Sequence, residues 1–424
     1  MTQPNHGPTT LSPARIRLAL LSLALGGFGI GSTEFVAMGL LPDIARDLLP
    51  GVYASSPEDA NAQAGWVISA YALGVVVGAP TIAAVAARWP RKRLLLALLT
   101  AFTLGTIASA LLPTFGLVLV ARFVSALPHG AYFGIASLVA ASLMGPGKRA
   151  RGVALVLSGL TIANVIGVPA ITWLGQAAGW RVAYLAVAAI FAATFVAVAL
   201  AVPWQAGDPG ATLARELRAF TRVQVWFALL IGAIGFGGLF AVYTYVAPLA
   251  TEVTGLTPAL VPLVLVVIGI GMTVGNLVGG RLADWSVRRS MYLFFAVLAA
   301  ALLLLGLTAS NVVGLCVGVF LVGGASAALS PTIQARLMDV AKDSQSIAAA
   351  LNHSALNIGN SLGALLGGLA IAAGYGYVAP IWIGLLLTGA GVVLALGSFA
   401  VDRSRRRRGL DVPSVTAGFP AVEG

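Results

Sequence analysis

Glu34 is the residue whose type and position best suit it to chemistry. Of the 14 acidic residues, it alone lies well inside a long apolar segment, within the stretch Gly31 to Gly39. An ionised carboxylate inside a membrane span costs about 3 kcal/mol, whereas an apolar environment favours the neutral form. We therefore expect Glu34 to exchange a proton near neutral pH and to couple proton movement or anchor a polar substrate. The alternative is a protonated carboxyl group that bonds a neighbouring helix.

Arg122 is the one cation placed inside an apolar segment, in the stretch Ala121 to Gly130. A buried arginine requires carbonyl oxygens, a carboxylate or water around it. Two interpretations stay open, a proton relay or gate and a structural hub of hydrogen bonds. Because phosphate groups are bound by paired cations, a single arginine argues against an anionic substrate.

Other polar and aromatic side chains interrupt the apolar segments and could line a substrate cavity. His353, Asn357 and Asn360 have the i, i+4, i+7 spacing that places them on one face of a helix. The remaining candidates are single intrusions, Asn164, Asn276, Tyr243 and Tyr245, and the aromatic residues Phe35, Trp66 and Tyr71. For each of them the alternative is a hydrogen bond between helices or ordinary packing.

Metal, nucleotide and dinucleotide chemistry are not predicted. Cys316 is the only cysteine, and the three histidines are too few and too scattered for a metal site. No Walker A sequence is present, and Gly269 and Gly271 lie in an apolar run rather than at a strand-to-helix turn. We expect no cofactor and no drive by ATP.

The elements that must position these residues are membrane-spanning helices. With 59% hydrophobic residues, 9% charged residues and a mean hydropathy of +0.95, a soluble enzyme is excluded. Runs of about 20 apolar residues cross a bilayer. Twelve such runs occur, at 16–41, 64–87, 94–112, 115–143, 150–174, 181–203, 223–250, 257–282, 290–309, 312–336, 346–373 and 377–400. The fold class is therefore an all-α polytopic membrane protein.

The positions of the basic residues support this count. With the N-terminus inside, 22 of the 25 Lys and Arg fall in cytoplasmic segments, and only Arg46 and Arg181 fall outside. This distribution obeys the positive-inside rule. The net charge of +11 is thus a sign of topology, and no nucleic-acid partner is expected. We expect a multi-pass protein of the bacterial inner membrane with both termini in the cytoplasm.

An internal repeat divides the chain. At an offset of 197 residues, Gly78 matches Gly275, and Arg91 and Lys92 match Arg288 and Arg289. Two parallel six-helix repeats with a cytoplasmic linker form a secondary-transporter architecture. The predicted organisation is a tail at 1–15, a six-helix bundle at 16–203, a linker at 204–222, a second bundle at 223–400 and a basic tail at 401–424.

Glycines spaced by four residues are predicted to mark close contacts between helices. They are Gly27 and Gly31, Gly159 and Gly167 with Ala163 between them, Gly271, Gly275 and Gly279, and Gly359, Gly363 and Gly367. Pro169 removes a backbone hydrogen bond, so we expect it to bend the fifth span.

From about Arg15 to Ala400, these segments together resemble the major facilitator superfamily, in its twelve-helix drug:proton antiporter branch. The loop signature is Gly280 to Arg289, and its first-half counterpart has Ala87 where the family usually has Asp. The arginine motif of the fourth helix matches at Arg122. The antiporter motif of the fifth helix matches loosely from Gly159 to Gly175.

This resemblance implies proton coupling at Glu34 and Arg122. It also implies gating roles in the two loop signatures and the fifth helix, for Arg91, Lys92, Gly167, Pro169, Asp284, Arg288 and Arg289.

A narrower resemblance is to the arabinose-efflux and chloramphenicol-efflux permeases of that branch. The residues that carry it lie in Thr33 to Val36, Gly39 to Ala45, Pro128 to Gly130 and Asn357 to Asn360. It implies a monomeric, proton-driven exporter of small neutral or weakly polar molecules, chloramphenicol-like ones first. The alternatives are efflux of an arabinose-like sugar or a purine ribonucleoside, a proton-linked importer, and least of all a membrane enzyme.

Overall fold

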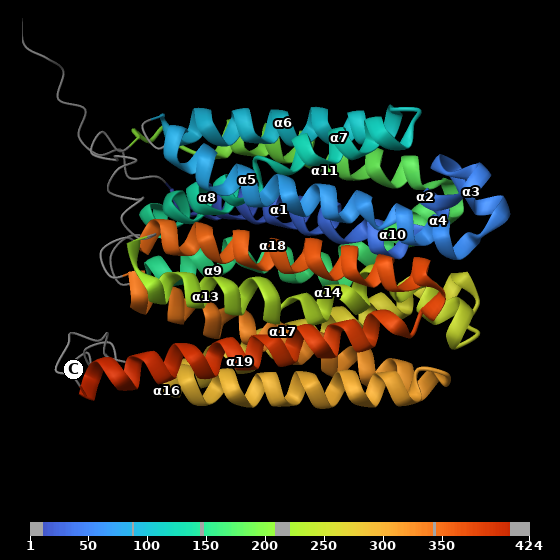
Figure 1. Ribbon diagram of the computed structural model, residues 1–424. Coiled ribbons are helices and arrows are strands. Elements are labelled where there is room, and N and C mark those ends of the chain that lie inside the picture. Colours follow the sequence, from blue (N-terminus) through green and yellow to red (C-terminus); the bar gives the residue numbers. More distant parts are fainter. Residues whose placement is uncertain (1–11, 87–88, 145–147, 208–220, 342–344, 408–424) are drawn as a thin grey trace, which may run out of the picture.

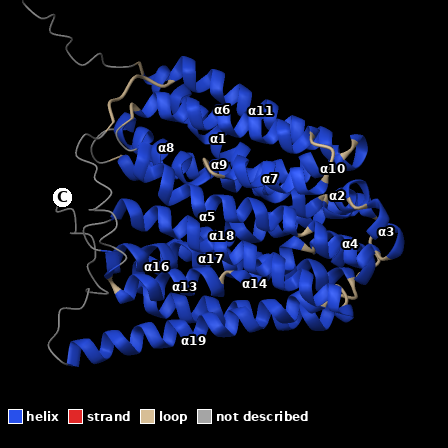
Figure 2. Ribbon diagram, turned by 45° about the horizontal axis from the view of Figure 1, so that its top comes forward, coloured by secondary structure: helices blue, strands red, loops and turns tan. Residues whose placement is uncertain are grey.

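The computed structural model describes residues 12–86, 89–144, 148–207, 221–341 and 345–407, and these residues form helices joined by short loops (Figures 1 and 2). An apolar backbone segment in a bilayer must satisfy its own N–H and C=O groups, and a helix does so within one segment. The predicted tails and linker fall largely outside the described residues.

In the first half of the chain, six spans are interrupted by three short helices after the first span. The elements are α1 (Pro13–Gly39), α2 (Leu41–Leu48), α3 (Pro50–Ser55), α4 (Pro57–Ala64), α5 (Trp66–Ala86), α6 (Arg91–Leu111), α7 (Phe115–Ala126), α8 (His129–Met144), α9 (Arg149–Ile162), the π-helix η1 (Ala163–Gly167), α10 (Val168–Ala178) and α11 (Trp180–Ala201).

The second half has fewer but longer helices. They are α13 (Val223–Gly235), α14 (Gly237–Thr244), α15 (Val246–Pro248), η3 (Leu249–Val253), η4 (Pro258–Leu260), α16 (Val261–Thr308), α17 (Val312–Ala341), α18 (Gln345–Ala370), η5 (Ile371–Tyr375) and α19 (Ala379–Arg407).

Eleven helical stretches of the described chain are long and apolar enough to cross a membrane. One of them, Pro258–Thr308, has 51 residues. It would be about 75 Å long as one helix, more than twice the thickness of the hydrocarbon core. Ser286 interrupts it with extended backbone (φ −165°, ψ 103°). The stretch therefore makes two crossings, and the described residues give the twelve that the sequence predicts.

Consecutive spans run antiparallel, so the chain turns alternately at two ends of the bundle. Short helices α2 to α4 lie at one end, which we call the α4 end (right in Figure 1). Arg91, Arg222 and Arg289 lie where spans begin at the other end, which we call the basic end. The two halves meet where α5 packs against α18 and where η1 and α10 pack against α16.

The predicted glycine contacts are confirmed, and they repeat between the halves. A Cβ atom on Gly78 of α5 would strike the backbone of Leu127, and one on Gly275 of α16 would strike the backbone of Gly324. The partners are separated by the same 197 residues as the glycines. Each half thus uses a small residue at one position to bring two backbones together.

We expect Gly159→Ala to destabilise the first half. Gly159 of α9 packs on the backbone of Ala24, and an added Cβ would lie 2.8 Å from the amide nitrogen of Phe28. Overpacking of this kind costs about 1–3 kcal/mol, so Tm in detergent should fall. The control is Gly280→Ala, because nothing lies within 4 Å of that position. Equal melting of the two variants would contradict the close contact.

Candidate transport site

Glu34 lies on α1 in the interior of the bundle, with 6% of its surface exposed. Its carboxyl group interacts with Asn360 of α18 and electrostatically with Arg122 of α7. Both amide atoms of Asn360 nevertheless lack a well-aligned hydrogen bond in the described structure. The carboxyl group therefore lies between the two halves, with a neighbour from each.

Arg122 is fully buried and is held mainly by the residue that precedes Glu34. Its two terminal nitrogens donate to the hydroxyl oxygen and the carbonyl oxygen of Thr33, each at 3.0 Å. The guanidinium also lies 4.2 Å from the ring centroid of Tyr71 and 5.3 Å from that of Tyr184. Such cation–π contacts are stronger where water is excluded. Arg122 is thus a hub of hydrogen bonds that remains within electrostatic reach of Glu34.

An aromatic stack connects the two halves next to Glu34. Phe35 of α1 stacks on Tyr243 of α14 with ring centroids 5.3 Å apart, and on Phe240 at 6.3 Å. Tyr243 is close enough to Glu34 for their charges to interact, and its buried hydroxyl group has no hydrogen-bond partner among the described residues. The structure thus places Phe35 and Tyr243 beside the carboxyl group.

The face of α18 that carries His353, Asn357 and Asn360 points toward the first half. Asn360 is beside Glu34, and His353 stacks on Phe133 of α8 with centroids 5.4 Å apart. Asn357 donates to the carbonyl oxygen of His353 at 3.0 Å, but its own Oδ1 is buried without a partner in the described chain. Buried amides that lack partners are rare in folded proteins, and here they share one face.

Asn164 lies in the π-helical turn η1, where the fifth span approaches α16. The backbone of Gly269 contacts the Asn164 carbonyl, and Asn164 Oδ1 is buried without a partner in the described structure. Pro169 lacks the N–H that would bond residue 165, and η1 ends at Gly167, two residues before Pro169. The irregularity expected from Pro169 is therefore a π turn, a feature often found at functional sites.

Two predicted cavity residues lie apart from this group. Tyr245 donates to the Ala364 carbonyl at 2.6 Å and packs near Gly65 at the α4 end. Its hydroxyl group therefore bonds within the second half and does not face Glu34. Asn276 is exposed, so the structure does not bring it to Glu34.

The basic loop residues predicted to act in gating hold two helices together in the first half only. Lys92 donates to the Ala199 carbonyl at 2.7 Å, and Arg91 bonds Gln205, which fixes α6 to the end of α11. In the second half Asp284, Arg288 and Arg289 are exposed. Among the described residues, no ion pair of Asp284 is formed, and Arg289 lies over the ring of Trp285 at 5.3 Å. The predicted loop there is reduced to the single extended residue Ser286.

Arg336 is a second buried cation besides Arg122. The sequence interpretation places Arg336 in a cytoplasmic segment, but it is 1% exposed inside α17. It pairs with the buried Asp402 of α19 at 2.6 Å, and it donates to Gln224 and Ser398. Hydropathy missed the pair because both residues lie near span ends, where charges are common.

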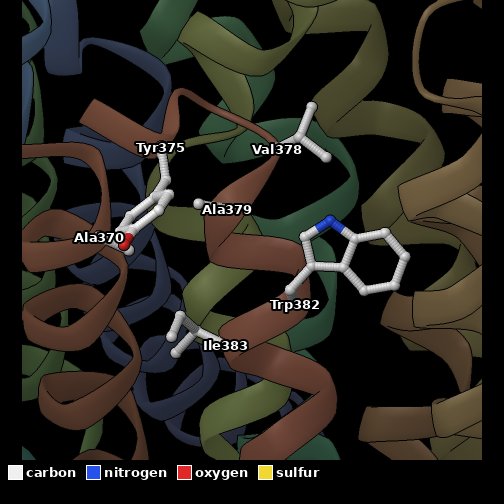
Figure 3. A pocket seen from close by; sticks show the side chains of 6 residues that line it. All are labelled: Ala370, Tyr375, Val378, Ala379, Trp382 and Ile383. Carbon is white, nitrogen blue, oxygen red and sulfur yellow. The ribbon is translucent and has the colours of Figure 1, made fainter. Parts of the chain in front are cut away.

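Two of the surface cavities formed by described residues are each lined by one half alone, so neither lies between the halves. One, of about 340 Å³, is apolar and lies at the junction of η5 and α19, with Tyr375 and Trp382 on opposite sides of it (Figure 3). The other, of about 620 Å³, lies at the α4 end within the first half. Burial raises the pKa of Asp43 in its wall, and Arg46 opposes that shift.

Cross-half hydrogen bonds at the α4 end are a further feature that the sequence did not predict. Asn61 of α4 donates to the Tyr377 hydroxyl at 2.8 Å, and Gln176 donates to the Pro258 carbonyl at 2.9 Å. These residues lie in segments that read as loops or span ends. Their only sequence signal is an amide beside an apolar run, which is too common to be diagnostic.

Comparisons with known proteins agree with this geometry. The family described as Major Facilitator Superfamily matches residues 23–286 and 229–423. The chain is 40% identical over 384 residues to the inner membrane transport protein YdhP of Escherichia coli (strain K12), which covers 91% of this chain and 96% of that protein.

A chloramphenicol resistance protein of Streptomyces lividans is 34% identical over 387 residues, covering 89% of this chain and 95% of that one. Among solved structures, a D-xylose-proton symporter matches with a TM-score of 0.72 and 15% identity, over 95% of this chain and 99% of that one.

Proposed function

The chain belongs to the major facilitator superfamily, and from that premise we propose that it is a proton-coupled exporter of small neutral or weakly polar molecules. Family membership confirms the resemblance that the sequence motifs indicate and the predicted all-α polytopic fold. The chain is a multi-pass transporter of the inner membrane, not an enzyme. Proton coupling, export and the kind of substrate are the proposal.

The observation that carries the proposal is the position of Glu34. A carboxyl group in an apolar interior exchanges its proton at a pH closer to neutrality than one in water. Glu34 has two polar neighbours, Arg122 of the first half and Asn360 of the second half. Because rocking of the halves changes the distance to Asn360, the proton affinity of Glu34 would change with the conformation.

The side chains around Glu34 support a neutral substrate with hydrogen-bonding groups. Asn164, Asn357 and Asn360 offer amide atoms without partners in the described structure, and Phe35 with Tyr243 offers flat aromatic surface. Amides recognise hydroxyl and amide groups and do not compensate a charge. The similarity to a chloramphenicol resistance protein supports an amphenicol as the first probe.

We propose that the basic end is cytoplasmic, with both termini there, and that the protein works as a monomer by alternating access. The positive-inside rule supports this orientation. In the described state Asn61, Tyr377, Gln176 and Pro258 join the halves at the α4 end. Opening toward the outside would break these bonds. Arg91 and Lys92 would hold α6 and α11 together during that motion.

The test is the pH inside everted vesicles without a pre-formed gradient, read with an entrapped dye after a probe is added. Chloramphenicol, arabinose and a purine nucleoside are added in turn. An exporter that exchanges protons for substrate takes the probe in and releases protons from the lumen, so we expect the luminal pH to rise with chloramphenicol.

Each other outcome has a distinct meaning. A rise with arabinose or the nucleoside instead keeps the antiport but replaces the substrate class. A fall in luminal pH indicates proton symport and contradicts export. The absence of any response to the three probes contradicts this substrate class.

A further inference from the structure

Two imidazoles lie inside the bundle, and the coupling proposed for Glu34 does not use them. His129 of α8 is 2% exposed. Its ring centroid is 5.9 Å from that of His353 on α18, so the pair bridges the two halves. A neutral imidazole can accept a proton at one ring nitrogen and release one from the other.

Tyr71 of α5 connects these imidazoles to the Glu34 region. Its hydroxyl oxygen lies 3.3 Å from His129 Nδ1. Its ring lies under the guanidinium of Arg122 at 4.2 Å, and Tyr71 and Glu34 are close enough to interact electrostatically. One side chain thus touches both the carboxyl region and the histidine pair.

The groups that lead from Glu34 through Tyr71 to the two imidazoles follow one another along the bundle and not across it. Asn360 lies beside Glu34, and His353 is seven residues nearer to the start of α18, which is about 10 Å along a helix. That start lies at the basic end. His353 is partly exposed, whereas His129 is buried. The imidazoles are therefore displaced from Glu34 toward the basic end, and His353 is the less buried of the two.

The groups that face the pair are few and come from known elements. Tyr71 faces His129 from α5, with Arg122 of α7 and Glu34 of α1 behind it. Phe133 of α8 packs against both rings. No carboxylate among the described residues forms an ion pair with either imidazole.

We propose that Tyr71, His129 and His353 carry the coupled proton between Glu34 and the basic end. The Tyr71 hydroxyl group gives its proton to His129 Nδ1 and regains one from the Glu34 side. His129 releases a proton from its other nitrogen toward His353, through one bridging water. His353 releases it to water at the basic end. His129 is left with its proton on Nδ1 instead of its other nitrogen, and reorientation of the ring restores the starting tautomer before the next proton; one proton moves and nothing else is consumed.

This proposal rests on the proposed proton coupling, and its test separates transport driven by protons from exchange of substrate. The variants are His129→Gln, which keeps a polar side chain without titration, and Tyr71→Phe. The control is Tyr132→Phe, which removes a buried hydroxyl group that bonds the Leu23 carbonyl in the same half. Chloramphenicol uptake into everted vesicles is measured under a proton gradient, and chloramphenicol exchange is measured without one.

We expect gradient-driven uptake to fall by about a hundredfold in His129→Gln and Tyr71→Phe, while exchange and the control remain at the wild-type rate. If exchange falls together with driven uptake, the residues are structural or bind substrate, and the relay is wrong. Full driven uptake in both variants also overturns the relay but leaves coupling at Glu34 intact. If the wild type itself shows no proton-driven uptake, the proposed function fails first.

A second measurement does not depend on the probe. The chain has three histidines, so its ¹⁵N-imidazole spectrum in nanodiscs contains signals from three rings, with two nitrogens each, that single substitutions assign. The relay predicts that Glu34→Gln changes the pH dependence of the His129 or His353 signal, and that Glu58→Gln on the exposed surface of α4 does not. Signals that titrate alike in both variants overturn the relay.

Discussion

Glu34→Gln should reduce proton release driven by the transported compound to the background of vesicles that lack the protein. Glutamine keeps the size of the side chain and can still bond Asn360, so the fold and the packing next to Phe35 are retained. What it loses is the exchangeable proton, at a position where each half contributes one polar neighbour, Arg122 or Asn360. The measurement is the change of luminal pH in everted vesicles on addition of the probe that the wild type transports.

The matched control is Glu58→Gln, which makes the same chemical change on the exposed surface of α4. Glu34→Asp should keep part of the response, because it shortens the side chain but preserves the carboxyl group. A wild-type response in Glu34→Gln would remove this residue from the coupling path. In that case the interpretation of Glu34 as a protonated helix contact would hold.

Arg336→Met should produce the largest loss of stability of any single change considered. It leaves the Asp402 carboxylate 4% exposed inside the second half without its 2.6 Å partner. Breaking a buried ion pair from one side costs about 3–5 kcal/mol. The measurement is Tm of the detergent-solubilised protein, followed as the loss of the monodisperse fraction on heating.

Two comparisons test this explanation. The double variant Arg336→Met/Asp402→Leu removes both charges and should recover most of the lost Tm, since a buried pair replaced by apolar residues is often neutral. Arg46→Met breaks an exposed contact with Asp43 at 3.9 Å and should cost less than about 1 kcal/mol. If the double variant melts as low as Arg336→Met, loss of packing and not an unpaired charge is responsible.

The fold was predictable because its main constraint is local. A bilayer admits a helix wherever about 20 apolar residues follow one another, and this rule reads along the chain without reference to distant segments. It located all twelve crossings, including the two that the structure joins through Ser286 alone. The glycine contacts were also predictable, since a missing side chain marks a close approach whichever helix fills the space.

The candidate site was predictable in part, for the same reason. Glu34 and Arg122 stand out because each is a charge in an apolar run. Their neighbours do not stand out: Tyr71 reads as one aromatic among many, and nothing in its sequence surroundings indicates a contact with Arg122 and His129. The prediction for Asn276 was wrong for the opposite reason. A polar residue in a span is interpreted as interior, although the sequence does not show which way its side chain faces.

The sequence by itself determined the membrane class, the number of spans, the 197-residue repeat and the carboxyl group of Glu34 far from the ends of an apolar segment. These depend on the free energy of transferring single side chains into an apolar phase. That free energy is a property of each residue type and does not depend on distant segments. Only the tertiary structure decided that Arg336 meets Asp402, that Phe35 stacks on Tyr243, and that two histidines from opposite halves lie together. Such pairs depend on the rotation and depth of each helix, which are set by packing against segments far away in the chain.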